Sequence, residues 1–271
     1  MKSKSPNFDQ MISSLKASRK YRSLDLPREF LMDILVSESR LHSDPRILEK
    51  VFRRKVHEVV APYLENIDYP SEEVRLIQVF ESADPLQIRA FCLDLLAKHS
   101  STRERIPFIH DLYPALFGIT GKPGIILDLA CGLHPFGLPW MGLDKNLSYC
   151  AYDIHKPRID LINQFLSLSG YASLAEQRDI LVCPPLNPAD VTFLFKEAHR
   201  IEKRKPGATK QLLQEIDSKW VIISLPVTDL RGHHDLSLRH RLLLASIIPN
   251  NYTVAQELRL GDELFFMLAK K

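Results

Sequence analysis

The feature that most restricts the fold of this chain is a series of short predicted strands, each with an acidic residue at or just past its end. Three of them come in succession, namely Ile125–Leu129 with Asp128, Leu147–Tyr152 followed by Asp153, and Ala172–Gln177 followed by Asp179. A helical stretch, Arg158–Ser169, separates the second from the third, and apolar strands at Val191–Phe195 and Trp220–Leu225 follow. Strands that alternate with helices at this spacing predict a mostly parallel α/β sheet. Such sheets bind ligands at the carboxyl ends of their strands.

The end of the chain has a different pattern. Tyr252–Leu260 and Glu263–Ala269 flank the turn Gly261-Asp262, which predicts a β-hairpin. An antiparallel hairpin on the edge of a parallel sheet is the terminal arrangement of Rossmann-like methyltransferases. We therefore predict an α/β, Rossmann-like domain over residues 103–271.

The first part of the chain is predicted to be helical. Phe8, Met11, Ile12 and Leu15 form one helical stripe. Further stripes follow Ser43-Asp44-Pro45 and Asp84-Pro85, which are helix start signals, and residues 103–117 are predicted as the last helix before the sheet. We expect an all-helical domain over residues 1–102.

Charge is unevenly distributed. The whole chain carries a net charge of +3, whereas residues 1–60 hold 13 Lys and Arg against 8 Asp and Glu. A basic N-terminal part suits a polyanionic partner, although a solvated helical surface is the alternative. The cations predicted to dock RNA are Lys16, Arg19, Lys20, Arg22, Arg53, Arg54 and Lys55.

Several classes of protein are disfavoured. No apolar run approaches the roughly 20 residues needed to cross a bilayer, and no signal core follows the N-terminus. Four widely spaced cysteines without a zinc-type Cys/His cluster predict no metal site and four buried, reduced thiols. We expect a cytoplasmic monomer.

The acids at the strand ends predict a nucleoside cofactor. Asp153 can accept both ribose hydroxyls, and Asp179 can accept from an adenine amino group. Gly132 has no Cβ and lets the backbone approach a ligand, but the G-x-G-x-x-G that seats a pyrophosphate is absent, which favours S-adenosylmethionine over a nicotinamide cofactor. Helix N-caps are the structural alternative for the acids. The predicted set is Asp128, Ala130, Gly132, Asp153, Ile154, Asp179 and Ile180.

Several segments together resemble the aminoglycoside-resistance 16S rRNA (guanine-N7) methyltransferases. They are His99-Ser100-Ser101-Thr102-Arg103-Glu104-Arg105, Leu127–Pro135, Tyr152–His155, Asp179–Pro185, Leu194-Phe195-Lys196, Ser224-Leu225-Pro226 and Ala17–Arg22. The resemblance implies a helical RNA-binding domain joined to a Rossmann-like methyltransferase domain. It implies methylation of guanosine N7 in the decoding A site of the assembled 30S subunit, with resistance to aminoglycosides of the kanamycin and gentamicin type.

The resemblance also implies roles for individual residues. Arg105 is expected to hold the cofactor carboxylate with Thr102 nearby, and Lys196 to act on the ribosome by positioning the target. The sequence departs from the family at His134, where Asn is usual, at Leu225, and in the loop Thr228–Asp235, which contains Arg231, an expected RNA contact.

Guanine N7 carries an exposed lone pair, so we predict alignment without an obligate general base. For His134, His233 and His234, loop or RNA-contact roles are favoured over proton transfer. An adenine-N1 or other RNA methyltransferase and a non-catalytic ribosome-binding protein stay open as alternatives.

Overall fold

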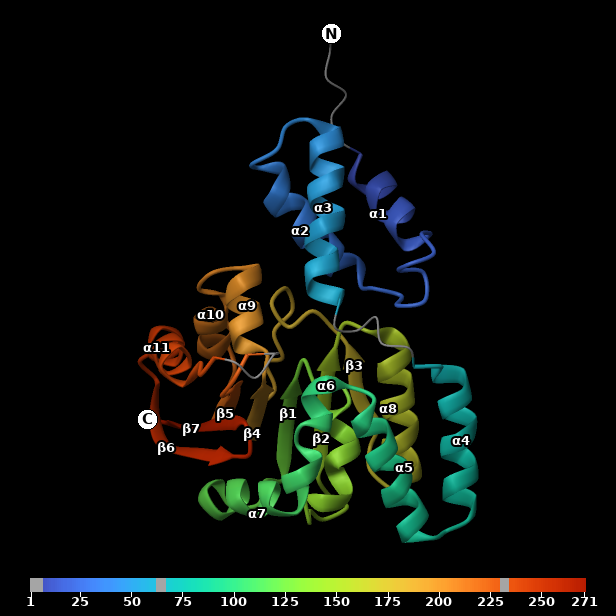
Figure 1. The fold of residues 1–271 in the computed structure, drawn as a ribbon, viewed down its shortest axis with the longest axis vertical. Helices are drawn as coiled ribbons and strands as arrows, with labels where there is room; N and C mark the ends of the chain where they lie inside the picture. Colours follow the sequence, from blue (N-terminus) through green and yellow to red (C-terminus); the bar gives the residue numbers. More distant parts are fainter. Residues whose placement is uncertain (1–6, 62–66, 230–233) are drawn as a thin grey trace.

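A seven-stranded mixed sheet forms the centre of the molecule (Figure 1). The computed structural model describes residues 7–61, 67–229 and 234–271. The strand order is β3-β2-β1-β4-β5-β7-β6; β1 to β5 run parallel, and β7 is antiparallel to both β5 and β6. The strands are β1 Ile125–Leu129, β2 Ser148–Asp153, β3 Leu174–Gln177, β4 Ala189–Phe195, β5 Ser218–Pro226, β6 Tyr252–Leu260 and β7 Glu263–Lys270. The predicted parallel sheet with a C-terminal hairpin is confirmed.

The central strands β1, β4 and β5 are mostly apolar because the sheet is covered on both faces there. In β1, Ile126 packs into one hydrophobic cluster and its neighbour Leu127 into another. Successive side chains of a strand point to opposite faces, so a fully covered strand reads as a continuous apolar run. This explains why the sheet is visible in the sequence.

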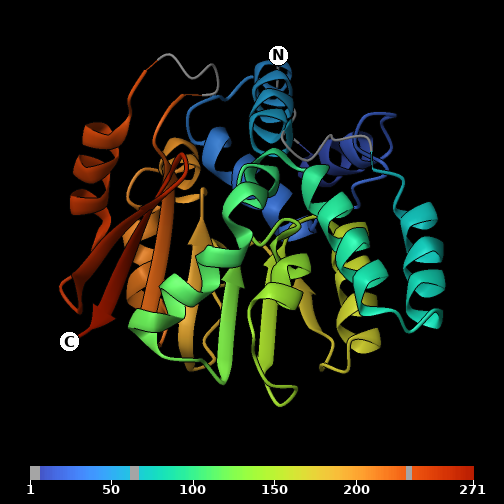
Figure 2. The same ribbon diagram turned by 60° about the horizontal axis from the view of Figure 1, so that its bottom comes forward.

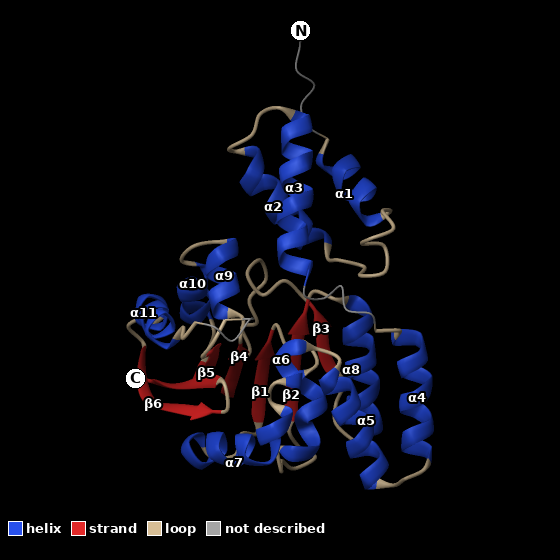
Figure 3. Cartoon of the chain, in the orientation of Figure 1, coloured by secondary structure: helices blue, strands red, loops and turns tan. Residues whose placement is uncertain are grey.

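The two faces carry different helices (Figures 2 and 3). One face packs against α4 Tyr69–Glu81, α5 Pro85–Ala97, α7 Ile109–Thr120, α8 Lys156–Leu168 and the 3₁₀ helix η3 His134–Trp140. The other packs against α9 Ala198–Arg204, α10 Ala208–Glu215 and α11 Ser237–Ile247.

A separate helical bundle lies above the sheet in Figure 1. It consists of α1 Phe8–Lys16, α2 Arg28–Ser39 and α3 Pro45–Val60, which share a hydrophobic cluster of their own. The predicted stripe of α1 is buried, with Leu15 fully covered, and Asp44 caps α3 by accepting from the backbone N–H of Arg46 and Ile47. The helical N-terminal part is therefore confirmed.

The packing of α4 and α5 bears on the domain division. Leu76 of α4 and Phe91 of α5 belong to the cluster of the sheet, not to that of the bundle. The boundary expected between residues 102 and 103 stays a prediction, but the packing favours placing α4 and α5 with the sheet.

The single helix expected over residues 103–117 is wrong. The chain instead forms α6 Ser100–Arg103, the 3₁₀ turn η2 Ile106–Phe108 and then α7. Pro107 cannot donate a backbone hydrogen bond, and its ring disfavours a helical conformation of Ile106. The interruption turns Arg105 into the interior, where its side chain is buried.

The structure bears on two expectations from composition, the burial of the four cysteines and the lack of a membrane-spanning segment. Cys92, Cys131 and Cys150 are buried free thiols, whereas Cys183 is exposed, so the prediction of four buried cysteines is wrong at that position. Cys183 lies in the loop after β3, outside the core. Among the described helices, none is both long and apolar enough to cross a bilayer.

Candidate functional site

A cleft of about 1210 Å³ lies between the helical bundle and the carboxyl ends of the parallel strands. This is the edge at which an open α/β sheet binds ligands. The predicted residues that line it are Lys55 from the RNA-docking set and Arg105, Asp128, Ala130, Gly132, Asp153, Ile154, Asp179, Ile180 and Lys196. The fold thus brings together predicted residues that are up to 141 positions apart in the chain, from Lys55 to Lys196.

The backbone after β1 takes up an unusual conformation. Ala130 and Gly132 both have positive φ angles, 51° and 55°. A positive φ is costly for alanine and easy for glycine. The turn exposes backbone to the cleft, and the N–H of Gly132 donates to Asp153 Oδ2 at 3.0 Å.

Asp128 belongs to a buried polar cluster below this turn. Its Oδ2 accepts from the Tyr149 hydroxyl at 2.7 Å and lies 2.9 Å from His134 Nδ1. The His134 ring packs against Phe193 and Phe195 and does not line the cleft. The loop or RNA-contact role favoured for His134 is therefore wrong. The 3₁₀ helix that begins there packs against one face of the sheet, and the His134 side chain is buried.

Asp153 is held by the protein from several sides. Oδ1 accepts from the N–H of His155 at 2.9 Å, and Oδ2 accepts from Arg158 Nη1 at 3.2 Å as well as from Gly132. Arg158 is fully buried, and its Nε donates to the Tyr69 hydroxyl. Because each carboxylate oxygen has two lone pairs, Oδ1 keeps one for a further donor.

Asp179, like Asp153, is held by a backbone N–H and by an arginine. Its Oδ1 accepts from the N–H of Leu181 at 3.0 Å, and both oxygens accept from Arg204. The acid caps no described helix, and the helix after Asp153 is capped by His155 instead. The N-cap alternative for these acids is therefore wrong.

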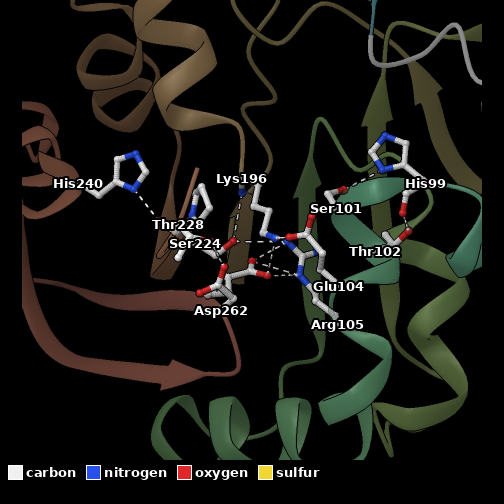
Figure 4. A network of polar contacts seen from close by, with 12 residues as sticks. His99, Ser101, Thr102, Glu104, Arg105, Lys196, Ser224, Thr228, His240 and Asp262 are labelled. Atoms are coloured by element: carbon white, nitrogen blue, oxygen red, sulfur yellow. Dashed lines mark hydrogen bonds and ion pairs between the residues drawn. The ribbon is translucent and has the colours of Figure 1, made fainter. Parts of the chain in front are cut away.

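Arg105 and Lys196 lie close together in one polar network (Figure 4), and both pair with the buried Glu263. Arg105 donates from Nε and Nη2 to Glu263, with a shortest distance of 2.7 Å, and Lys196 Nζ lies 3.4 Å from the same carboxylate and also pairs with Glu104. Burial alone would raise the pKa of Glu263, but the two cations hold it below its ordinary value. Nη1 of Arg105 has no hydrogen-bond partner among the described residues.

Lys196 itself stands on strained backbone. Its φ is 55°, a conformation that side chains of this size rarely adopt. Its N–H donates to the carbonyl of Ser224 on β5 at 2.9 Å, which anchors the turn. Such strain is characteristic of functional sites.

Thr102 does not join the cleft. Its hydroxyl lies 2.6 Å from the carbonyl oxygen of Leu96 and 3.1 Å from that of His99, and its single proton can be donated to either. His99 lines the cleft instead, and it is 5% exposed with its Nε2 lacking a hydrogen-bond partner in the described structure. Burial lowers the pKa of His99 to about 3, so the ring is neutral.

The predicted RNA-docking residues fall into two groups. Arg19, Lys20 and Arg22 are exposed on the bundle. The other four are ion-paired, Lys16 with Asp25, Arg53 with Glu49, Arg54 with Glu58, and Lys55 with Glu38. Arg231 lies outside the described residues, as does His233.

Sequence reasoning missed Arg204, which lines the cleft, and Glu263, which pairs with the lining residues Arg105 and Lys196. The composition of the charge run Glu202–Lys205 predicts an exposed loop, but its first three residues end α9, and Arg204 is largely buried. Glu263 also gives no local signal, because the turn before it predicts only a hairpin. Both residues reach their positions through tertiary packing.

The chain matches a known family over most of its length. A model of the FmrO family, described as ribosomal RNA methyltransferase, matches residues 18–239. The match runs from the helical bundle to α11 and thus includes the whole set of strand ends. The chain belongs to the FmrO family of ribosomal RNA methyltransferases.

Relatives of this FmrO family member agree with that assignment. It is 26% identical over 268 residues to the 16S rRNA (guanine(1405)-N(7))-methyltransferase of Micromonospora rosea, covering 97% of both chains. The fold matches that of the 16S rRNA methylase RmtB with a TM-score of 0.79 and 23% identity, covering 98% of this chain and 99% of RmtB. It also matches that of the 16S rRNA methyltransferase RmtF in complex with S-adenosyl-L-homocysteine, with a TM-score of 0.80 and 22% identity, covering 97% of this chain and 98% of RmtF. The predicted enzyme class, a ribosomal RNA methyltransferase, is confirmed.

Proposed function

We propose that this enzyme methylates N7 of a guanosine in the decoding A site of 16S rRNA, in the assembled 30S subunit, and thereby gives resistance to aminoglycosides of the kanamycin and gentamicin type. It is proposed to act as a monomer in the cytoplasm. The observation that carries the proposal is the full-length similarity to a guanine-N7 methyltransferase of 16S rRNA, combined with a cleft that both the bundle and the strand ends line.

The residues of the cleft fit S-adenosylmethionine. Arg105 Nη1 is available to a carboxylate, and the remaining lone pair of Asp153 Oδ1 is available to a ribose hydroxyl. The unpartnered Nε2 of His99 is a buried polar atom at the same cleft, beside Gly132. An unpaired buried polar atom costs free energy that a ligand group recovers by bonding to it.

The chain contributes to the reaction mainly by alignment. When bound, S-adenosylmethionine supplies an activated methyl group that passes to the N7 lone pair, and the sulfonium becomes a neutral thioether. The acids hold the nucleoside, Arg105 holds the carboxylate, and Lys196 positions the target nucleotide. No residue needs to remove a proton, because N7 carries none.

The decisive experiment offers the purified protein three substrates: 30S subunits, free 16S rRNA and tRNA. We expect methyl transfer from S-adenosylmethionine to 30S subunits, and mapping should locate the product at a guanine N7 of the decoding site. A product on tRNA alone, or on adenine N1, would contradict the proposal. Expression in a susceptible bacterium should raise resistance to kanamycin and gentamicin, and Asp153→Asn should abolish that effect.

A further inference from the structure

One arginine is shared between the helical bundle and the sheet. Arg204, the last residue of α9, donates from Nη1 and Nη2 to the two oxygens of Asp179 at 3.1 and 2.6 Å. Nη2 also donates to Oδ2 of Asp33 at 3.0 Å. Because Asp33 lies on α2, one guanidinium joins the wall of the cleft formed by the bundle to the wall formed by the strand ends.

The surroundings hold this guanidinium in place. Its carbon atom lies 4.9 Å from the centre of the Phe30 ring, which is fully buried on α2. The side chain of Arg204 is 14% exposed, and those of Asp33 and Asp179 are 25% and 2% exposed. Charge-assisted bonds in such a shielded place are stronger than those on the surface.

The hydrogen bonds of Asp179 can be counted. Oδ1 accepts from the N–H of Leu181 and from Arg204 Nη1, which uses both of its lone pairs. Oδ2 accepts from Arg204 Nη2 and keeps one lone pair. Nη2 of Arg204 is shared, because it also donates to Asp33. This sharing weakens its hydrogen bond to Asp179 Oδ2 and leaves that oxygen a better acceptor for a ligand.

We propose that Asp33 and Arg204 are positioning residues that set Asp179 to accept the adenine amino group, so that the helical bundle takes part in recognising the cofactor. This inference rests on the proposed adenine role of Asp179. When Asp33 loses its charge, Arg204 pairs with Asp179 alone and binds it more strongly. The Asp179 carboxylate is then a poorer acceptor for the neutral amino group of adenine. The contact of the bundle with Arg204 through Asp33 thus favours binding of adenine at Asp179, and adenine binding in turn favours that contact.

The test compares two ligands that differ at the C6 substituent and at the neighbouring N1 of the base. S-adenosylhomocysteine presents an amino group to Asp179, whereas S-inosylhomocysteine presents a carbonyl that cannot donate to it. Calorimetry measures the affinity of the wild-type protein, of Asp33→Asn and of Asp9→Asn for both ligands. Asp9 is the matched control, because it also pairs with an arginine in the bundle, Arg28 at 2.6 Å, but does not line the cleft.

We expect the wild-type protein to prefer the adenosyl ligand. Asp33→Asn should weaken S-adenosylhomocysteine binding by about fivefold, the lower end of typical coupling between sites, while affinity for the inosyl ligand changes less. The adenosyl preference therefore falls in Asp33→Asn and stays at the wild-type level in Asp9→Asn.

Other outcomes overturn the inference in distinguishable ways. An unchanged adenosyl preference in Asp33→Asn refutes it, and so does an equal loss for both ligands, which a merely structural role would produce. If Asp33→Asn does not fold by circular dichroism, Arg204→Lys decides, because lysine keeps the charge but lacks the fork that bridges two carboxylates, and the same fall in preference is expected. A wild-type protein that binds neither ligand contradicts the proposed function instead.

Discussion

At the scale of the residue, the cleft is organised by charges that are paired inside the protein. Glu263 holds Arg105 and Lys196, and Arg158 holds Asp153. Each of these carboxylates is almost completely buried, and a buried charge is tolerated only when it is paired. The site is therefore preorganised before a ligand enters.

Loss of the Glu263 carboxylate should be costly. In Glu263→Gln the two cations lose their shared anion, and breaking a buried pair in this way costs about 3–5 kcal/mol in the free energy of unfolding. Denaturant unfolding measures the loss. Glu257→Gln is the control, since it breaks an exposed pair with Arg241 and should change stability much less. Equal losses in both variants would contradict the assigned role of Glu263.

At the scale of the element, helix boundaries place the functional side chains. The interruption between α6 and α7 turns Arg105 inward, and the start of α8 places His155 beside Asp153. The side chain of His155 caps α8, because its Nδ1 accepts from the N–H of Arg158 at 3.2 Å. Burial lowers the pKa of His155 to about 3.

This cap gives a pH-dependent prediction. His155→Ala should lower the free energy of unfolding by about 1 kcal/mol at pH 7, whereas His155→Asn keeps an acceptor and should lose less. The pKa of His155 is depressed in the folded state, so its contribution is full above its ordinary value of 6.5 and is lost as the pH falls towards 3.

Asn at position 155 does not titrate. Denaturant unfolding at pH 7 and pH 5 should therefore show wild-type stability falling relative to His155→Asn at the lower pH. A constant difference between the two proteins would mean that His155 is not held neutral by burial.

At the scale of the whole molecule, the bundle and the sheet together enclose the cleft. Arg200 of α9 donates to the carbonyl of Val59 on α3 at 3.1 Å, and Arg204 reaches Asp33. The exposed cations Arg19, Lys20 and Arg22 lie on the same bundle. A surface that docks ribosomal RNA would thus be connected to the reactive site.

Charge reversal tests the docking surface. Arg19→Glu combined with Lys20→Glu should weaken 30S binding and flatten its salt dependence, because each phosphate contact contributes about 0.7–0.9 to the slope of log affinity against log salt. Filter binding at several salt concentrations measures both effects. Lys219→Glu with Lys270→Glu is the control at the opposite end of the sheet. Unchanged 30S affinity and slope in the bundle variant would rule out docking through these two residues.

Much of this protein follows from local sequence. Burial of both sheet faces makes the central parallel strands mostly apolar, and a period of 3.6 residues marks the helices of the bundle. The parallel topology then places Asp153, which ends β2, and Asp179, which follows β3, at one edge of the sheet. For this reason the strand pattern and its flanking acids are enough to predict that Asp153 and Asp179 line one cleft, as they do.

Tertiary structure alone decided what surrounds those residues. Glu263 lies 158 positions from Arg105, and Asp33 lies 171 positions from Arg204, so no local pattern links them. Whether a given polar side chain faces the cleft or the backbone, as His99 and Thr102 illustrate, depends on a turn of the chain that hydrophobic periodicity does not specify. The sequence by itself thus determined the sheet and its strand-end acids, whereas long-range packing determined the partners that hold those acids and the cations beside them in place.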